Sequence, residues 1–139
     1  EVSDYNKGYL NLLKNLTDVG TISEEYFKKQ YEYLKNRQDS FVRVIEDKMA
    51  NKVVATGTIY IEYKFIHQVG KVGHIEDLVV DKEYTGKGIA GELINFCLDK
   101  LSSDTHYKVI LNCTEELKTF YVKFGFVEKN IQMAIHLKI

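Results

Sequence analysis

The sequence predicts a mixed α/β domain (an α+β arrangement) in which helices flank a central, mostly antiparallel sheet with one parallel crossover. Two observations support this prediction. The spacing of apolar residues changes from helical to β-type near residue 40, and one later helical segment separates two β-like segments. Strands joined through a helix run parallel, whereas strands joined by short turns run antiparallel. At 139 residues the chain has the length of one domain, and we expect a single domain over residues 1–139.

Two helices are expected before the sheet. Apolar residues recur with helical spacing between Tyr5 and Leu16, and Ser3 is the expected N-cap of this first helix. The pattern Thr21-Ile22-Ser23-Glu24 predicts a capping box for a second helix, which should run from Glu24 to about Asn36. The apolar face of the second helix should be formed by Phe27, Tyr31 and Leu34.

Strand and helix patterns alternate over the rest of the chain. β-Branched and aromatic residues predict strands, and apolar stripes at helical spacing predict helices. The expected strands are Phe41–Ile45, Val53–Phe65, His74–Val80, Tyr107–Leu111 and Gln132–Ile139, and the expected helices between them are Ala90–Leu101 and Glu115–Phe124. A turn near Ala50-Asn51 should join the first two strands.

Composition limits the classes of function. The 19 Lys and Arg balance 20 Asp and Glu, so no nucleic-acid partner is expected. No apolar run reaches membrane-spanning length, no signal-peptide pattern opens the chain, and the histidines lack metal-ligand spacing, so we expect neither a membrane span nor a metal. The first residue is Glu, so we expect a few further residues upstream. Cys97 and Cys113 lie in apolar patterns, which predicts buried free thiols in a reducing, cytoplasmic compartment.

The stretch Gly86-Lys87-Gly88-Ile89-Ala90-Gly91 stands directly before a predicted helix, and three interpretations of it compete. It matches the dinucleotide pattern G-x-G-x-x-G, but five residues, Asp81–Thr85, separate it from the preceding strand. It also fits a tight turn that requires glycine. In the third interpretation, the free amides and the positive end of the helix dipole bind the pyrophosphate of an acyl-CoA.

A family resemblance favours the third interpretation. Thr85-Gly86-Lys87-Gly88-Ile89-Ala90 resembles the [QR]-x-x-G-x-[GA] pyrophosphate loop of the GNAT N-acetyltransferases, with Thr85 where the family usually has Arg or Gln. Four further stretches, in this order and spacing, closely resemble the eukaryotic-type glucosamine 6-phosphate N-acetyltransferases. They are Leu16–Ile22, Ile61–His67, Gly73–Val80, and Tyr107–Cys113 followed by Phe120–Phe126. The resemblance extends from about Tyr9 to Lys138.

The resemblance implies a fold, a reaction and a site for acetyl-CoA. The GNAT sheet is splayed open at the acetyl-CoA site. The acetyl group would pass directly, in a ternary complex, to the amine of D-glucosamine 6-phosphate, giving N-acetyl-D-glucosamine 6-phosphate and CoA on the route to UDP-N-acetylglucosamine. The amides of Leu78 and Val80 would pair with the pantetheine arm and orient the thioester carbonyl. The implied acetyl-CoA-binding residues are Leu78, Val79, Val80, Gly86, Lys87, Gly88, Ile89, Ala90 and Gly91.

The resemblance also implies a sugar-phosphate site. Glu76 and Asp77 would accept hydrogen bonds from the amine and the hydroxyls. The phosphate would be held by residues among Thr17, Lys64, His67, Lys108 and His136, and the wall would be shaped by Phe65, Ile66 and Tyr107. His136 stands where the family usually has Arg. The final strand would form an intimate homodimer, in which His136 serves the active site of the neighbouring subunit.

Two residues are implied in the chemistry. Tyr121 would protonate the leaving CoA thiolate, because the intrinsic pKa values of a phenol and a thiol are close. The backbone carbonyl of Asn112 would hold the amine in line for attack, although the family often has an acid at this position. No covalent enzyme intermediate is expected, and proximity carries much of the acceleration.

Taken singly, these residues also have ordinary interpretations. A tyrosine beside Phe120 fits a core position, Lys64 and Lys108 fit surface lysines, and adjacent acids such as Glu76 and Asp77 point to opposite faces of a regular strand. Two rival functions stay open: a GNAT enzyme with another amine acceptor, and a catalytically weak acyl-CoA-binding regulator. The cations Lys64 and Lys108 favour an anionic acceptor.

Overall fold

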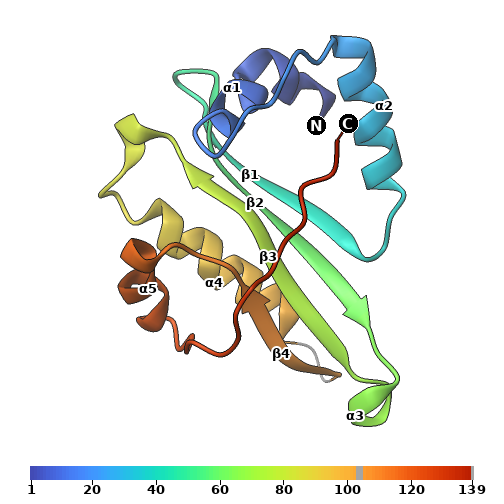
Figure 1. Cartoon of the computed structure of the whole chain (residues 1–139). Coiled ribbons are helices and arrows are strands. Elements are labelled where there is room, and N and C mark those ends of the chain that lie inside the picture. Colours follow the sequence, from blue (N-terminus) through green and yellow to red (C-terminus); the bar gives the residue numbers. More distant parts are fainter. Residues whose placement is uncertain (103–104, 139) are drawn as a thin grey trace.

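The computed structural model describes residues 1–102 and 105–138, which form a four-stranded sheet with helices packed against it (Figure 1). The strands are β1 (Ser40–Asp47), β2 (Lys52–Tyr63), β3 (Lys71–Val80) and β4 (His106–Leu111), in the order β1-β2-β3-β4. The first two pairs are antiparallel, and β3 and β4 are parallel. The predicted mixed sheet with one parallel crossover is therefore confirmed.

The crossover helix α4 (Ile89–Leu101) contributes the larger core. The predicted stripe is confirmed, since Leu93, Ile94, Cys97 and Leu101 are buried. The last three of these pack with Ile59 and Ile75 of the sheet and with Tyr121 of α5 (Glu115–Val122). A smaller core lies around Leu12 of α1 (Tyr9–Leu13), with Val53 and Val79. The hydrophobic effect thus fixes α1 and α4 on the sheet.

The N-terminal helices differ in part from the prediction. The expected first helix is broken at Gly8, whose φ of 80° separates η1 (Val2–Lys7) from α1. Glu1, not Ser3, is its N-cap. The second helix, α2 (Glu24–Lys35), is confirmed, and its cap is Ser23 rather than Thr21, because the Ser23 hydroxyl accepts a hydrogen bond from the amide of Tyr26. Phe27, Tyr31 and Leu34 form its half-buried face, as predicted.

The sheet opens at one end. Pairing between β3 and β4 reaches only Ile75 and Leu111, while β3 continues beside β2 to Val80. A β-bulge in β3 accompanies this opening: Thr58 pairs with Glu76 and Thr56 with Val79, which leaves one extra residue in β3. Asp77, inside the bulge, has a φ of 50°. Because a bulge breaks the regular alternation of side chains, the opposite orientation expected for Glu76 and Asp77 does not follow here.

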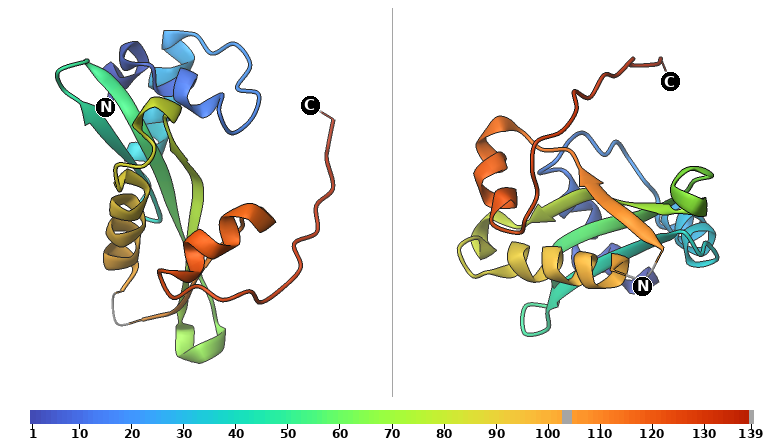
Figure 2. Two further views of the ribbon diagram at one scale, coloured as in Figure 1. Left: turned by 90° about the vertical axis from the view of Figure 1, so that its left-hand side faces the viewer. Right: turned by 90° about the horizontal axis from the view of Figure 1, so that it is seen from below.

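The predicted final strand, Gln132–Ile139, is wrong over its described residues. No strand is assigned between residues 127 and 138, and Figure 2 shows this segment running away from the sheet. Its alternate apolar side chains are 81–91% exposed. A strand needs a neighbouring backbone to bond with, and alternation in sequence does not specify where that neighbour is. Ile139 lies outside the described residues.

No helix in residues 1–102 and 105–138 is long and apolar enough to cross a membrane.

Close packing of α4 on β3 predicts the effect of one substitution. A Cβ built on Gly73 would lie 2.6–3.0 Å from three side-chain carbons of Leu101. We expect Gly73→Ala to lower the free energy of unfolding by about 1–3 kcal/mol, because overpacking forces a shift in the core. Urea unfolding monitored by circular dichroism measures this change. Gly57→Ala is the matched control, because its Cβ would meet Leu78 only at 3.8 Å. Equal stability of both variants would contradict the packing argument.

Candidate functional site

A glycine loop leads from β3 into α4 through the short η2 turn (Lys82–Tyr84). Gly86 and Gly88 have φ values of 77° and 78°, in the left-handed region that favours glycine. A Cβ at either glycine would meet nothing within 4 Å, so the outer side of the loop is open. Gly88 is the N-cap of α4, and no side chain of the described residues caps this end. The start of this 13-residue helix therefore has no side-chain cap and follows a loop with an open side, as an anion site requires.

The other residues of this stretch have identifiable contacts. The Lys87 ammonium lies 4.9 Å from the centroid of the Tyr84 ring. A Cβ on Gly91 would lie 3.4 Å from Cζ of Phe124, so the third glycine also allows close packing of α4 against that ring. Ile89 and Ala90 are half-buried in the first turn of α4. Leu78, Val79 and Val80 lie in the part of β3 beyond its pairing with β4.

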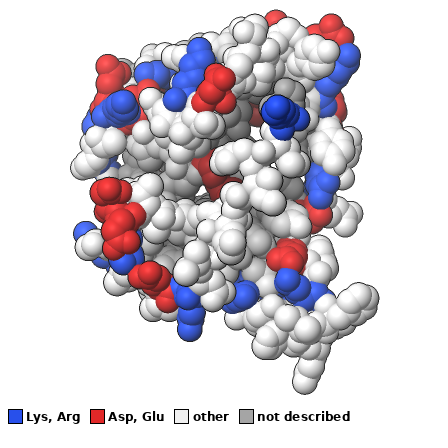
Figure 3. Space-filling view, in the orientation of Figure 1, with Lys and Arg blue, Asp and Glu red and all other residues white. Residues whose placement is uncertain are grey.

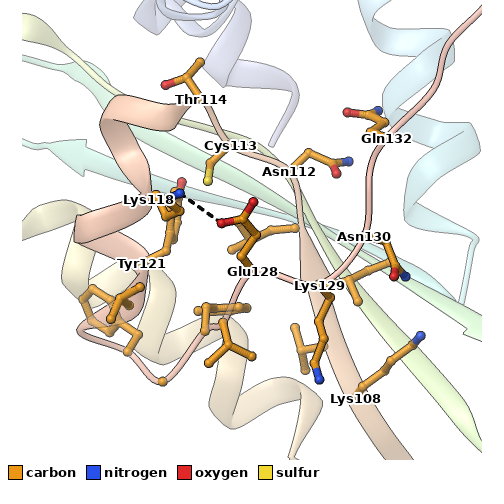
Figure 4. A pocket seen from close by; sticks show the side chains of 18 of the residues that line it. Lys108, Asn112, Cys113, Thr114, Lys118, Tyr121, Glu128, Lys129, Asn130 and Gln132 are labelled. Carbon is orange, nitrogen blue, oxygen red and sulfur yellow. Dashed lines mark hydrogen bonds and ion pairs between the residues drawn. The ribbon is translucent and has the colours of Figure 1, made fainter.

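A cavity of about 600 Å³ brings several of the predicted residues together (Figure 4). It is lined by the end of β4, by α5 and by the segment that follows α5. Tyr121, Asn112 and Lys108 all line it. The sequence spacing did not show this grouping, because the three residues come from a strand, a loop and a helix.

Tyr121 is 8% exposed and packs against the rings of Phe120 and Phe126, at centroid distances of 5.0 and 6.0 Å. Burial raises the pKa of its phenol, and the nearby Cys113 thiol raises it further. The hydroxyl therefore stays protonated at neutral pH and is able to donate a proton.

The two cysteines differ from each other. Cys97 is buried as predicted, and burial raises its pKa to about 11. The prediction for Cys113 was wrong: it lies past the end of β4 and is exposed in the cavity wall. An apolar pattern predicts burial only inside a regular element, and Cys113 follows the last strand residue by two positions.

Lys118 and Glu128 also line the cavity, and the sequence did not single them out. The Lys118 ammonium pairs with Glu115 at 2.5 Å and with Glu128 at 3.0 Å. These two hydrogen bonds raise the pKa of Lys118. The i,i+3 spacing of Glu115 and Lys118 is the one signal in the sequence that could have revealed this cluster.

The tip between β2 and β3 holds a second group of predicted residues. β2 ends at Tyr63, so Lys64 and Phe65 lie outside the strand that was expected to include them. Within the short helix α3 (Ile66–Val69), the His67 ring stacks on Tyr107 with 4.1 Å between centroids. Phe65 is 96% exposed and Ile66 is 59% exposed. The structure thus brings His67 beside Tyr107 and leaves Phe65 and Ile66 on the surface.

Lys64 already has a partner. Its ammonium forms an ion pair with Glu62, whose other carboxylate oxygen lies 2.9 Å from Nε2 of His74. Lys64 and then His74 lower the pKa of Glu62, and Glu62 raises the pKa of Lys64. An incoming phosphate would have to share Lys64 with this carboxylate.

The remaining predicted residues lie apart from the cavity. Glu76 is half-buried and Asp77 exposed at the bulge of β3, and neither lines the cavity. Thr17 lies after α1, and His136 lies in the exposed C-terminal segment. Figure 3 shows a hollow near the centre of this face with acidic atoms inside it, and mixed charges around it. No group of three or more His, Cys, Asp or Glu suited to a metal occurs in residues 1–102 and 105–138.

Comparison with known proteins gives consistent results. The model of the acetyltransferase (GNAT) family matches residues 9–126. The glucosamine 6-phosphate N-acetyltransferase of Arabidopsis thaliana is 42% identical over 135 residues, which cover 96% of this chain and 91% of that protein. Glucosamine 6-phosphate N-acetyltransferase 1 of Oryza sativa subsp. japonica is 39% identical over 137 residues, which cover 98% of this chain and 83% of that protein.

Solved structures agree with the sequence comparison. The crystal structure of glucosamine-6-phosphate N-acetyltransferase from Arabidopsis thaliana superimposes with a TM-score of 0.96 at 40% identity, covering 99% of this chain and 95% of that one. An acetyltransferase of Trypanosoma brucei superimposes with a TM-score of 0.91 at 32% identity, over the same shares of the two chains.

Proposed function

Because this chain belongs to the GNAT family, among the glucosamine 6-phosphate N-acetyltransferases, we propose that it transfers the acetyl group of acetyl-CoA to the amine of D-glucosamine 6-phosphate. The products are CoA and N-acetyl-D-glucosamine 6-phosphate, a step toward UDP-N-acetylglucosamine. The observation that carries the proposal is the 42% identity to the Arabidopsis thaliana enzyme over 96% of the chain. Cys97 and Cys113 are free thiols, which suit a protein that works in the reducing cytoplasm. The reaction would take place within one catalytic domain.

Acetyl-CoA would bind between the splayed strands and the glycine loop. The open side of Gly86 and Gly88 and the uncapped start of α4 support pyrophosphate binding by the amides of residues 86–91, with Lys87 adding a positive charge. Beyond Ile75, β3 has no pairing with β4. The amides of Leu78 and Val80 in this stretch, on either side of Val79, are therefore suited to pair with the pantetheine arm and to polarise the thioester carbonyl.

The chemistry would be direct attack in a ternary complex. The neutral amine forms a bond to the thioester carbon, the carbon–sulfur bond breaks, and the CoA thiolate takes a proton from the Tyr121 hydroxyl. The new amide nitrogen releases its extra proton to water, and the Tyr121 phenolate takes a proton back from water. The backbone carbonyl of Asn112 would hold the amine in line for this attack. Support comes from the shared cavity of these two residues and from the raised pKa of Tyr121, which keeps the phenol protonated.

The sugar phosphate would lie near the β2–β3 tip. Lys64, Lys108 and His67 supply positive charge or hydrogen-bond donors, and the stacked His67 and Tyr107 rings provide a wall with Phe65 and Ile66. Glu76 and Asp77 would accept hydrogen bonds from the amine and the hydroxyls, and Thr17 would donate one to the phosphate. The bulge supports this role, because it exposes Asp77 at the open end of the sheet.

A second copy of the chain would complete the site. The apolar residues Ile131, Met133, Ile135 and Leu137 alternate along an exposed segment, and β4 is an edge strand of the sheet, paired on one side with β3. We place the C-terminal segment against a second copy in a homodimer, with His136 reaching the sugar phosphate of the neighbour.

A comparison of phosphorylated and unphosphorylated amine acceptors tests the proposed function. We expect CoA thiol release with D-glucosamine 6-phosphate to exceed release with glucosamine by about a hundredfold in kcat/KM, because charge-assisted contacts to phosphate are strong. Lys108→Met should reduce this preference, and Lys28→Met, on the exposed side of α2, should not. Binding of acetyl-CoA without release for either sugar would refute the acceptor and leave another amine, or a binding protein without catalysis.

A further inference from the structure

The position of the glycine loop depends on its flanks, because Gly86 and Gly88 have open space around them and Thr85, Lys87 and Gly88 are exposed. On one side the loop continues into α4, which the core holds. On the other side stands Tyr84, the last residue of η2. The contacts of Tyr84 therefore decide how firmly the start of the loop is held.

The hydroxyl of Tyr84 ties the loop to a distant part of the sheet. It donates a 2.6 Å hydrogen bond to Oδ2 of Asp47, which is 37 residues away at the end of β1. The other oxygen of Asp47 accepts from the amides of Met49 and Ala50, at 3.0 and 3.1 Å, so the carboxylate is itself fixed by the β1–β2 turn. The tether thus runs from the β1–β2 hairpin to the residue before Thr85.

The ring of Tyr84 lies beneath two lysines. The ammonium of Lys52, at the beginning of β2, is 5.8 Å from its centroid. The ammonium of Lys87, the only lysine between Thr85 and Gly91, lies 4.9 Å from its centroid. A cation over a tyrosine ring is attracted to its face. The Tyr84 ring thereby holds the Lys87 ammonium close to the glycine loop.

The start of η2 is also tied to the sheet. Lys52, at the beginning of β2, pairs with Asp81 at 2.7 Å, and the amide of Asp81 donates to the carbonyl of Val54 at 2.7 Å. Asp81 in turn accepts from the amide of Glu83 at 2.9 Å. Among residues 1–102 and 105–138, however, only Tyr84 contacts both the hairpin and the loop lysine. It is therefore the residue whose loss should release the loop specifically.

We propose that Tyr84 is a positioning residue for the nucleotide end of acetyl-CoA: its hydroxyl, held by Asp47, fixes the start of the glycine loop, and its ring orients Lys87 toward the pyrophosphate. This inference rests on the proposed function for the identity of the ligand. A loop held in its binding conformation before the ligand arrives loses less entropy on binding. The clamp formed by Tyr84, Asp47 and Lys87 should thus raise the affinity for ligands that carry the pyrophosphate and leave the affinity for other ligands unchanged.

The test compares two acetyl donors in the full-length protein. Acetyl-CoA carries the pyrophosphate, and acetyl-pantetheine carries the same thioester without it. We expect Tyr84→Phe, which keeps the ring, to raise the KM for acetyl-CoA about threefold to fivefold, and Tyr84→Leu, which loses both contacts, about tenfold or more. The kcat and the KM for D-glucosamine 6-phosphate should not change, and kcat/KM with acetyl-pantetheine should equal that of the wild type.

Tyr26→Phe is the matched control, since Tyr26 also carries a lysine over its ring, Lys29 at 5.6 Å, but lies on α2. It should leave every kinetic constant unchanged. Equal losses with both donors, a fall in kcat, or wild-type kinetics in Tyr84→Leu would each overturn the inference. The first two would indicate a general structural role, which a lower melting temperature with proportional loss of activity would confirm.

A direct binding measurement separates this inference from the proposed function. Isothermal titration calorimetry with CoA and with pantetheine requires no acceptor. If the wild type acetylates no glucosamine 6-phosphate but Tyr84→Leu weakens CoA about tenfold and leaves pantetheine unchanged, the clamp is supported and the proposed acceptor is refuted. If the wild type does not bind CoA, both fail.

Discussion

Replacing Tyr121 by Phe should lower kcat at least about a hundredfold, because general acid catalysis by a positioned side chain contributes that much or more. The substitution removes one hydroxyl from a side chain that is 8% exposed, and it keeps the ring that packs on Phe120 and Phe126. The KM for acetyl-CoA should change little. Thiol release under saturating substrates, with circular dichroism to confirm folding, measures the effect.

The pH profile adds a second readout for Tyr121. Burial raises the pKa of its phenol, so the protonated, proton-donating form is present below that raised value and is lost only as the pH rises through it. The wild type should therefore keep its rate past the ordinary tyrosine pKa of 10.0, and any decline above it should be absent from Tyr121→Phe. Wild-type kcat in Tyr121→Phe would show that the leaving thiolate departs without this acid.

Introducing a charge at Ile135 should separate the proposed dimer into monomers. Ile135 is 88% exposed in the single chain, so Ile135→Glu should not affect the stability of an isolated protomer. If the apolar side of the C-terminal segment packs on a second copy, two isoleucines are buried per symmetric dimer, each worth about 1.5–3 kcal/mol. The dimer dissociation constant should then rise at least about a hundredfold.

Sedimentation velocity measures the change in mass, and the same samples give the activity. Lys138→Glu is the matched control, because it changes charge on the opposite side of the alternating segment and should remain dimeric. Activity should fall with the loss of the dimer, since His136 of the second copy would no longer reach the sugar phosphate. A monomeric wild type, or a dimeric Ile135→Glu, would contradict the arrangement.

Local patterns predicted most elements of the fold because secondary structure repeats with a short period. The four strands and α2, α4 and α5 lie where the apolar spacing placed them, apart from their end residues. The glycine stretch indicated an anion site for the same reason, since backbone freedom at Gly86 and Gly88 depends on those residues alone. The expected ligand and the expected role of Tyr121 as the acid came from the family resemblance, because a lone tyrosine is compatible with many positions.

The errors share a physical cause. Gly8 breaks the first helix because its left-handed backbone turns the chain. One such residue does not change the helical spacing of the apolar residues on either side, so the spacing did not predict the break. Asp77 adopts the same region in a bulge that depends on how β3 pairs with β2. The exposure of Cys113 depends on which segments meet past the end of β4. The last two outcomes are set by neighbours that are distant in sequence, and none of the three is encoded in the spacing of apolar residues.

The sequence by itself determined the fold class, the order of α2, β1–β3, α4, β4 and α5, and the glycine loop, because these follow from side-chain period and backbone freedom over a few residues. Only the tertiary structure decided which of these residues lie together. The cavity shared by Tyr121 and Asn112, the stacking of His67 on Tyr107, and the tether of Tyr84 to Asp47 all join separate elements. Such contacts form when the hydrophobic core fixes the elements on one another, and no local pattern encodes that geometry.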